Sequence, residues 1–235
     1  MLTSWARAPR GGLARHQDFR LLWLANGVSL AGSAITGVAL PMVAIYALDA
    51  SAFDVGLLAT MAWLPQLVLA LPAGIWIDRV RRRPVLVAAD LGRALILPVV
   101  PVAAAAGALH LWLLYVVAAV SGALTMLFGL GWAAYLPSLI SRDRLVEGNS
   151  RLEATRTVVG IGGPGLGGLL VQLLTAPLVL IVDALSYVVS ALCLIRIRSR
   201  EAPPEAPQQR GVRLLLGEAF EFLWRRPIVG VFVVF

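Results

Sequence analysis

The 235-residue sequence contains no lysine, one cysteine and two histidines, and these scarcities exclude several kinds of site. With Cys193 alone the chain cannot form an intrachain disulfide, and this residue lies in an apolar run where a small buried side chain is expected. His16 and His110 lie outside the hydrophobic runs and are assigned below to opposite sides of a membrane. The sequence therefore offers no metal cluster and no nucleophile paired with a base, and we expect no cofactor.

All twenty basic residues are arginine, and nineteen of them fall in four clusters separated by long, nearly uncharged runs. The connections around residues 49–54, 107–110 and 175–176 contain no arginine. Because short cytoplasmic loops are enriched in positive charge, the clusters are predicted to lie in the cytoplasm and the three bare turns outside. This dispersal over loops argues against a nucleic-acid partner, despite the net charge of +7. The clusters are Arg7, Arg10, Arg15 and Arg20; Arg79, Arg81, Arg82 and Arg83; Arg142, Arg144, Arg151 and Arg156; and Arg196, Arg198, Arg200, Arg210, Arg213, Arg225 and Arg226.

The composition places the chain in a lipid bilayer. Hydrophobic residues make up 59% of the sequence and charged residues 14%, which is beyond the range of a water-soluble domain of this length. A spanning helix needs about 20 mostly apolar residues. Six crossings return the chain to the side where it began, in agreement with the arginine clusters. Six runs qualify: Leu21 to Leu48, which is too long for a secretory signal, Val55 to Ile77, Pro84 to Leu109, Leu111 to Leu136, Val158 to Leu174 and Pro177 to Ile195.

Four segments follow from this pattern. Residues 1–20 are predicted to be a basic cytoplasmic leader, and residues 21–197 a bundle of six transmembrane helices. Residues 198–227 are predicted to be a cytoplasmic linker that starts with a flexible proline-rich stretch and continues as an amphipathic surface helix. Residues 228–235 start a seventh helix; because eight residues cannot cross a bilayer, we expect that this helix has been cut short.

The predicted inner turn after the second run carries a recognisable motif. Gly74 is followed by Asp78 and Arg79, with further arginines at Arg82 and Arg83. This resembles the best-known signature of the major facilitator superfamily, although Trp76, Ile77 and Arg81 depart from it. The resemblance implies that these five residues take part in an inner gate, with Gly74 allowing close helix contact and Asp78 accepting an arginine or a helix N terminus. The alternative is that the arginines only set orientation and that Asp78 is solvated.

The fifth run contains a glycine-proline motif, with Gly163 and Pro164 followed by Gly167 and Gly168. It resembles the fifth-helix signature that the same superfamily carries in exporters and antiporters. A proline removes a backbone hydrogen bond, and glycines leave a smooth face for another helix, so the motif predicts a hinge and packing surface. A phosphate-binding loop is the competing interpretation, but no Lys-Ser or Lys-Thr pair follows the glycines.

Three ionisable residues fall inside the runs. Asp90 and Arg93 are three residues apart on one helix face, about 9 and 13 Å along the third helix from its start. Charged groups at such depth are functional candidates by default, so both are expected to face a cavity. Alternatively, they form a pair that only neutralises itself. Asp183 in the sixth run is a third candidate cavity charge, with the alternative that it reaches the outer interface.

The resemblance covers most of the chain and includes the segment Asn149 to Arg156 and the stretch Asp183 to Tyr187, which look like the macrolide-efflux and enterobactin-exporter branch. It implies an all-α integral membrane protein, the N-terminal six-helix half of a major facilitator fold, multi-pass in the cell membrane with a cytoplasmic N terminus. The implied partners are the lipid bilayer, a small-molecule substrate and a C-terminal six-helix half.

The implied activity is secondary transport, not catalysis: proton-coupled export of small hydrophobic or amphipathic compounds by alternating access. One departure concerns the coupling. Many proton-coupled exporters carry an arginine in the fourth helix four residues before a glycine, whereas here Ala118 precedes Gly122. The alternatives are a fragment that does not transport, or a membrane-embedded enzyme using Asp90 and Asp183.

Overall fold

The computed structural model describes residues 17–140, 142–199 and 201, apart from the side chain of Arg142. Across this part of the chain the structure is helical and has no strand, as the hydrophobic runs predict. The helices are α1 (Gln17–Leu48), α2 (Ala52–Ile77), α3 (Arg82–Ile96), α4 (Val99–Ala105), α5 (Leu111–Leu139), α6 (Leu145–Leu174) and α7 (Ala176–Arg196), with a short 3-10 turn at Arg142–Arg144.

These residues contain six helices long and apolar enough to cross a membrane, with α3 and α4 together forming one of them. The predicted all-α bundle is therefore confirmed. Most of the basic leader, the amphipathic helix and the start of the seventh helix lie outside the described residues. Of the leader, residues 17–20 already belong to α1.

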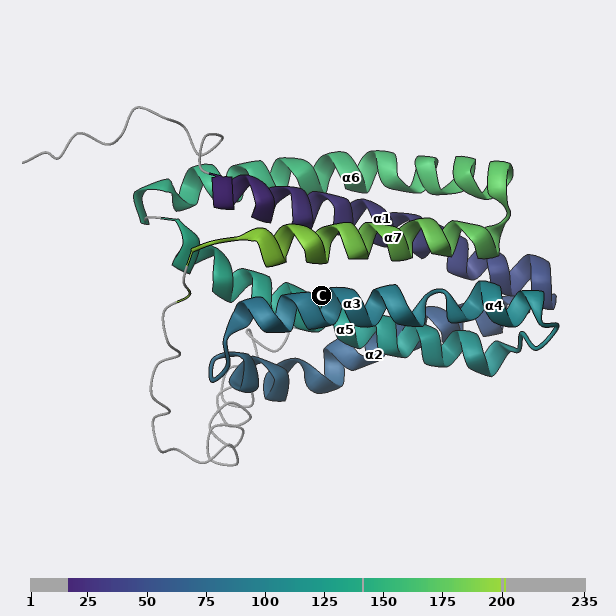
Figure 1. The fold of residues 1–235 in the computed structure, drawn as a ribbon. Helices are drawn as coiled ribbons and strands as arrows, with labels where there is room; N and C mark the ends of the chain where they lie inside the picture. The colour runs from purple at the N-terminus through teal and green to yellow at the C-terminus, as the bar shows by residue number, and fades with distance from the viewer. Residues whose placement is uncertain (1–16, 141, 200, 202–235) are drawn as a thin grey trace, which may run out of the picture.

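The two ends of the bundle differ in charge. Asp18 in the first turn of α1 accepts hydrogen bonds from the backbone N–H groups of Arg198 (3.2 Å) and Ser199 (2.9 Å), which follow α7. The beginning of the bundle and its end therefore lie together, as six crossings require (Figure 1). The described members of all four arginine clusters gather at this end, called here the arginine end, and the three arginine-free connections lie at the opposite end.

The third run does not form the single continuous helix that its hydropathy predicts. α3 ends at Ile96, and α4 begins only at Val99. The intervening Pro98 and the following Pro101 have no N–H to donate, so the regular ladder of backbone hydrogen bonds cannot pass through them. The break leaves Asp90 and Arg93 on the regular helix that starts at the arginine end.

The fifth transmembrane helix begins earlier than predicted. α6 starts at Leu145, not at Val158, and the segment Asn149 to Arg156 forms its first turns. The charges of this segment suit a helix, because Glu147 and Arg151 form an ion pair of 3.0 Å at i,i+4 spacing. Hydropathy detects the part of a helix that crosses lipid but not a polar extension beyond it, which explains the error.

Buried apolar side chains of the described residues form two clusters, one at each end of the bundle. Phe19, Leu22 and Leu194 belong to the arginine-end cluster. Val43, Leu114 and Val179 belong to the cluster at the opposite end. The buried polar residues of the described chain are called here the polar layer, and all but Asp183 lie on helix stretches between the two clusters: Ser29, Asp90, Arg93, Asp183 and Ser190.

Glycines set the closest approaches between helices. At Gly122 of α5 an added Cβ would collide with the backbone carbonyl oxygen of Ala62 in α2, which cannot move without separating the two helices. At Gly129 of the same helix an added Cβ meets nothing within 4 Å. The two positions therefore form a matched pair for testing the packing of α2 against α5.

Gly122→Ala is expected to lower the free energy of unfolding by about 1–3 kcal/mol, because the overpacked contact forces the helices apart. Gly129→Ala is expected to be neutral or stabilising by up to about 1 kcal/mol, because alanine favours the helix. Thermal unfolding of the purified protein in detergent measures both, and equal effects at the two positions would contradict the α2–α5 contact.

Candidate functional site

The centre of the polar layer is an ion pair on α3. Arg93 Nη2 lies 2.5 Å from Asp90 Oδ1, and the two residues are 1% and 0% exposed. The second carboxylate oxygen of Asp90 accepts a hydrogen bond of 2.6 Å from Ser190 Oγ on α7. Both oxygens of Asp90 are thus bound, and the pair connects α3 to α7.

The guanidinium of Arg93 is enclosed by aromatic rings. Its central carbon lies 4.1 Å from the centroid of the Tyr187 ring and 4.7 Å from that of Phe128, distances at which a cation is attracted to the ring face. Nη1 reaches Thr125 Oγ1 on α5 at 3.5 Å. Nε has no hydrogen-bond partner among the described residues. Arg93 thus joins α3, α5 and α7 and keeps one donor unused.

Asp183 on α7 has a different environment. Its carboxylate accepts hydrogen bonds from Thr36 Oγ1 on α1 and from Ser186 Oγ, the latter at 3.0 Å. It is 0% exposed, yet no cation of the described residues lies within ion-pair distance of it. Asp183 is therefore a buried acid held by hydroxyl groups alone.

Hydroxyl groups continue this arrangement between α1 and α7. Ser33 Oγ donates to the backbone oxygen of Ser29 (2.9 Å) and lies 2.8 Å from the Tyr187 hydroxyl. In the contact between Ser33 and Tyr187 either hydroxyl can be the donor.

Gly32 provides the space in which α1 packs against Asp183 and Ser186 of α7. A Cβ at this position would collide with Asp183 Oδ1 and with Ser186 Oγ, so only a glycine lets α1 lie against the buried acid. The next residues of α1 contact α6 instead: an added Cβ at Gly163 would lie 2.5 Å from Ala34 Cβ, and one at Gly167 3.3 Å from Ile35 Cα. One turn of α1 therefore touches α7 on one side and α6 on the other.

The structure places all three candidate charges inside the bundle, where packed helices enclose them. Their role at the transport cavity stays a prediction. Pairing and hydrogen bonding explain the burial, since a charged group in an apolar interior needs such partners. The sequence reasoning missed the hydroxyl groups, although Ser29, Ser33 and Thr36 repeat at helical spacing and so do Asp183, Tyr187 and Ser190.

Only part of the glycine-proline motif contacts another helix of the bundle. Gly163 and Gly167 are buried against α1. At Gly168 an added Cβ meets nothing within 4 Å of the described residues, and Pro164 lies exposed inside the helix. The motif thus packs Gly163 and Gly167 against α1, places Gly168 on the wall of the cavity described below and leaves Pro164 exposed.

The motif residues of the α2–α3 turn do not form a joint contact within this bundle. Asp78 is exposed at the end of α2, where its backbone N–H bonds to the Gly74 oxygen, and its carboxylate makes no hydrogen bond or ion pair within the described part. An added Cβ at Gly74 also meets nothing within 4 Å there, so the expected close helix contact is not made inside this bundle. Arg79 is partly exposed in the turn itself.

Arg82 and Arg83 are held by a partner that the sequence did not suggest. Their backbone N–H groups donate to the Glu201 carboxylate at 2.7 and 3.2 Å, so Glu201 caps the N terminus of α3. The Arg82 guanidinium also lies 3.6 Å from Glu201. Arg83 Nε donates to the Leu194 oxygen at 2.9 Å, at the C terminus of α7.

The chain directly after α7 is bound to the bundle at Arg198, Ser199 and Glu201, and most of the predicted flexible linker lies outside the described residues. Glu201 is bound to α3, and Arg198 and Ser199 are bound to Asp18 of α1. We call this set of contacts the arginine-end clamp. It could not be found from local sequence, because each bond joins residues more than 100 positions apart.

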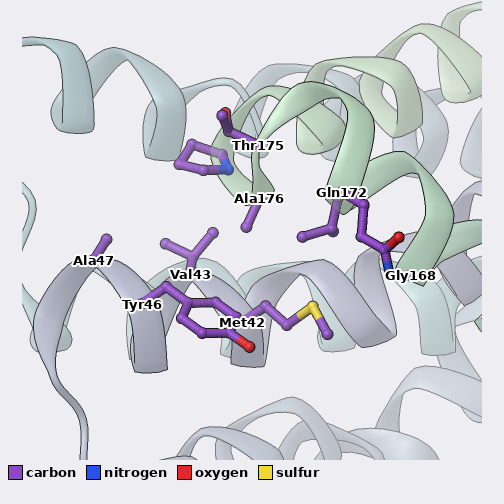
Figure 2. Close-up of a pocket in the computed structure, with 10 residues that line it drawn as sticks. Met42, Val43, Tyr46, Ala47, Gly168, Gln172, Thr175 and Ala176 are labelled. Atoms are coloured by element: carbon purple, nitrogen blue, oxygen red, sulfur yellow. The ribbon is translucent and has the colours of Figure 1, made fainter.

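A cavity of about 480 Å³ opens at the opposite end of the bundle. Figure 2 shows Met42, Val43 and Tyr46 of α1 facing Gln172 of α6 and Ala176 at the start of α7. Met42 follows Thr36 by six residues, about 9 Å along the helix axis. The hollow is mostly apolar, with Gln172 and Thr175 as polar groups on its wall.

Asp90→Asn is expected to lower the free energy of unfolding by about 3 kcal/mol, because it leaves the Arg93 guanidinium buried without its ion-pair partner. The double variant Asp90→Asn with Arg93→Met removes both charges and should lose less than the single variant. Denaturant unfolding in detergent measures the cycle, and a single variant as stable as the wild type would contradict the pairing.

Comparison with known proteins identifies a family and several relatives that this chain resembles. The family model described as the Major Facilitator Superfamily matches residues 22–235. The "Multidrug efflux pump Tap" of Mycolicibacterium fortuitum is 30% identical over 219 residues, which cover 87% of this chain and 51% of that protein. The "Uncharacterized MFS-type transporter YfiS" of Bacillus subtilis is 27% identical, covering 92% of this chain and 52% of that protein. The "Enterobactin exporter EntS" of Shigella dysenteriae is 27% identical, covering 93% and 52%. The chain spans about half the length of these curated relatives.

Proposed function

The chain belongs to the Major Facilitator Superfamily, and from that premise we propose that the whole protein is a secondary active transporter that exports small hydrophobic or amphipathic compounds in exchange for protons. Two of the relatives are named as an efflux pump and an exporter, which supports transport out of the cell over catalysis. The six described apolar helices make the chain a multi-pass membrane protein.

The observation that carries proton coupling is the polar layer. Two carboxylates and a guanidinium are buried among the described apolar helices, where ionisable groups are energetically costly and are therefore functional candidates. The Asp90–Arg93 pair also connects α3 to α5 and to α7. A layer whose charge changes when a proton binds is suited to alter the packing of those helices.

The apolar cavity between α1, α6 and α7 supports the proposed class of substrate. Its wall is formed mainly by Met42, Val43, Tyr46 and Val171, and it offers contacts to apolar and aromatic groups. Gln172 adds one hydrogen-bonding group. These walls suit a compound with a large apolar body and few polar atoms.

The partner of this bundle in alternating access is a second six-helix half. α2 and α6 are the least buried of the described spans and present large apolar side chains, including Leu67, Ile161 and Leu173. We infer that the second half packs against these helices and that the exposed Asp78 and the free side of Gly74 meet it. Asp78 and Arg79 then form the inner gate, with Arg82 and Arg83 anchored by the clamp.

The exposed face of α6 at Pro164 serves as the moving surface in this scheme, and Gly163 and Gly167 let α6 slide along α1. The arginine end is assigned to the cytoplasmic side of the cell membrane, because its clusters follow the positive-inside rule. The N terminus is then cytoplasmic as well.

Transport by the full-length protein in lipid vesicles tests the proposal. An imposed proton gradient is expected to drive uptake of some members of a panel of apolar and amphipathic dyes and antibiotics into inside-out vesicles. Addition of an uncoupler should abolish the uptake. Vesicles that take up no compound with or without the gradient would contradict the proposed function.

Asp78→Asn in the full-length protein is expected to reduce the transport rate about tenfold, the equivalent of roughly 1.4 kcal/mol of lost bias between the two states of the gate. Membrane insertion should be unchanged, because the side chain makes no contact within the described bundle. Asp143→Asn, at another exposed aspartate of the arginine end, is the matched control. Unchanged transport by Asp78→Asn would contradict the gating role.

A further inference from the structure

We propose that Asp183 is the residue that carries the exchanged proton, held by Thr36 and Ser186, and that Asp90 stays ionised as the fixed counterion of Arg93. This inference rests on the proposed function, because it names the group at which coupling takes place. It assigns different roles to two buried acids that the sequence alone does not distinguish.

The charges of the polar layer do not balance if all its members are ionised. Among the described residues it holds two carboxylates and one guanidinium, each at most 1% exposed. Arg93 is committed to Asp90 at 2.5 Å and is fixed by the rings of Phe128 and Tyr187. One negative charge is therefore left without a cation, and it belongs to Asp183.

Each helix that packs against α7 supports this count. α3 contributes Asp90 and Arg93, and Arg93 is close enough to Asp183 to interact with it electrostatically although it does not pair with it. α1 contributes only the hydroxyl groups of Ser33 and Thr36 near this level, and α7 itself contributes Tyr187. The charged residues of α6 lie in its first turns at the arginine end, and α4 has none.

A buried carboxylate without a cation is strongly disfavoured and is relieved when the group takes up a proton. Protonation of Asp183 forms an O–H bond on one carboxylate oxygen and removes the unbalanced charge. Protonation of Asp90 would instead leave the Arg93 guanidinium buried without its partner, so the proton belongs on Asp183. Release to the other side of the membrane breaks the same O–H bond and restores the carboxylate, with no change in oxidation state.

A proton also fits the surroundings better than a metal ion. Both oxygens of Asp183 lie beside hydroxyl groups, and a hydroxyl can donate to a carboxylate or, after rotation, accept from a carboxylic acid. No group of three or more acidic, histidine or cysteine side chains that could hold a metal occurs among the described residues. Sodium ions are therefore an outcome that the test must exclude and not the expected ligand.

The position of Asp183 connects it to the helix expected to move. Gly32 lets α1 lie directly on Asp183, and Thr36 of the same turn donates to it. The residues between them, Ala34 and Ile35, form the contact with Gly163 and Gly167 of α6. A displacement of α6 along α1 therefore changes the wall that encloses Asp183, and a change of charge on Asp183 acts on the same turn.

Transport by the full-length protein in vesicles provides the first test, using a compound from the panel above. Asp183→Asn resembles the protonated residue in shape and charge, so it should still exchange the compound down its concentration gradient. Its transport rate should be the same with and without an imposed proton gradient, whereas the wild type responds to the gradient. Asp49→Asn, at an exposed aspartate of the opposite end, is the matched control and should respond like the wild type.

The outcomes separate this inference from the proposed function. A wild type that transports, with an Asp183→Asn variant that still responds to the proton gradient, overturns the role of Asp183 alone. Transport driven by a sodium gradient and not by a proton gradient overturns both the proton as ligand of Asp183 and the proton exchange in the proposed function. A wild type that moves no compound overturns the proposed function.

Stability provides a second test that does not depend on transport. In detergent at neutral pH, Asp183→Asn should unfold at the same temperature as the wild type or higher, because it replaces a group that is already neutral. Asp90→Asn should unfold at a lower temperature. If Asp183→Asn lowers the unfolding temperature as much as Asp90→Asn does, Asp183 is ionised in the folded protein and the inference is wrong.

Discussion

The ion pair between Asp90 and Arg93 is the constraint on which the rest of the bundle depends. It places a positive charge in the middle of an apolar structure, and that charge is tolerated because Asp90, two aromatic rings and Thr125 surround it. The pair separates the hydrophobic cluster of the arginine end from that of the opposite end. It also determines how Asp183 behaves, since an arginine engaged elsewhere leaves that acid without a cation.

The turn of α1 from Gly32 to Thr36 connects the polar layer to α6. On one side it encloses Asp183, and on the other it supports the buried glycines of α6. Asp183 and the buried glycines of α6 therefore contact the same turn of five residues. The arginine-end clamp complements this turn, because Glu201 and Asp18 hold α1, α3 and the chain after α7 together.

The hydrophobic runs and arginine clusters predicted the six crossings and their alternation, because both depend on composition averaged over about 20 residues. The same averaging concealed the break at Pro98 and the polar start of α6. In the site, Asp90, Arg93 and Asp183 were recognisable as charges in apolar runs, but their enclosure was not, because it depends on Phe128, Tyr187 and Thr36 from other helices. Glu201 was beyond local reasoning for the same reason, since its partners are over 100 residues away.

The central claim is that the polar layer contains one ion pair and one neutral acid. Infrared spectroscopy of the full-length protein in lipid at neutral pH tests it most directly, because a protonated carboxyl group absorbs separately from ionised carboxylates. The account predicts a carboxylic acid band in the wild type that persists in Asp49→Asn and disappears in Asp183→Asn. A wild-type spectrum with ionised carboxylates only, or a band that Asp183→Asn leaves unchanged, would contradict it.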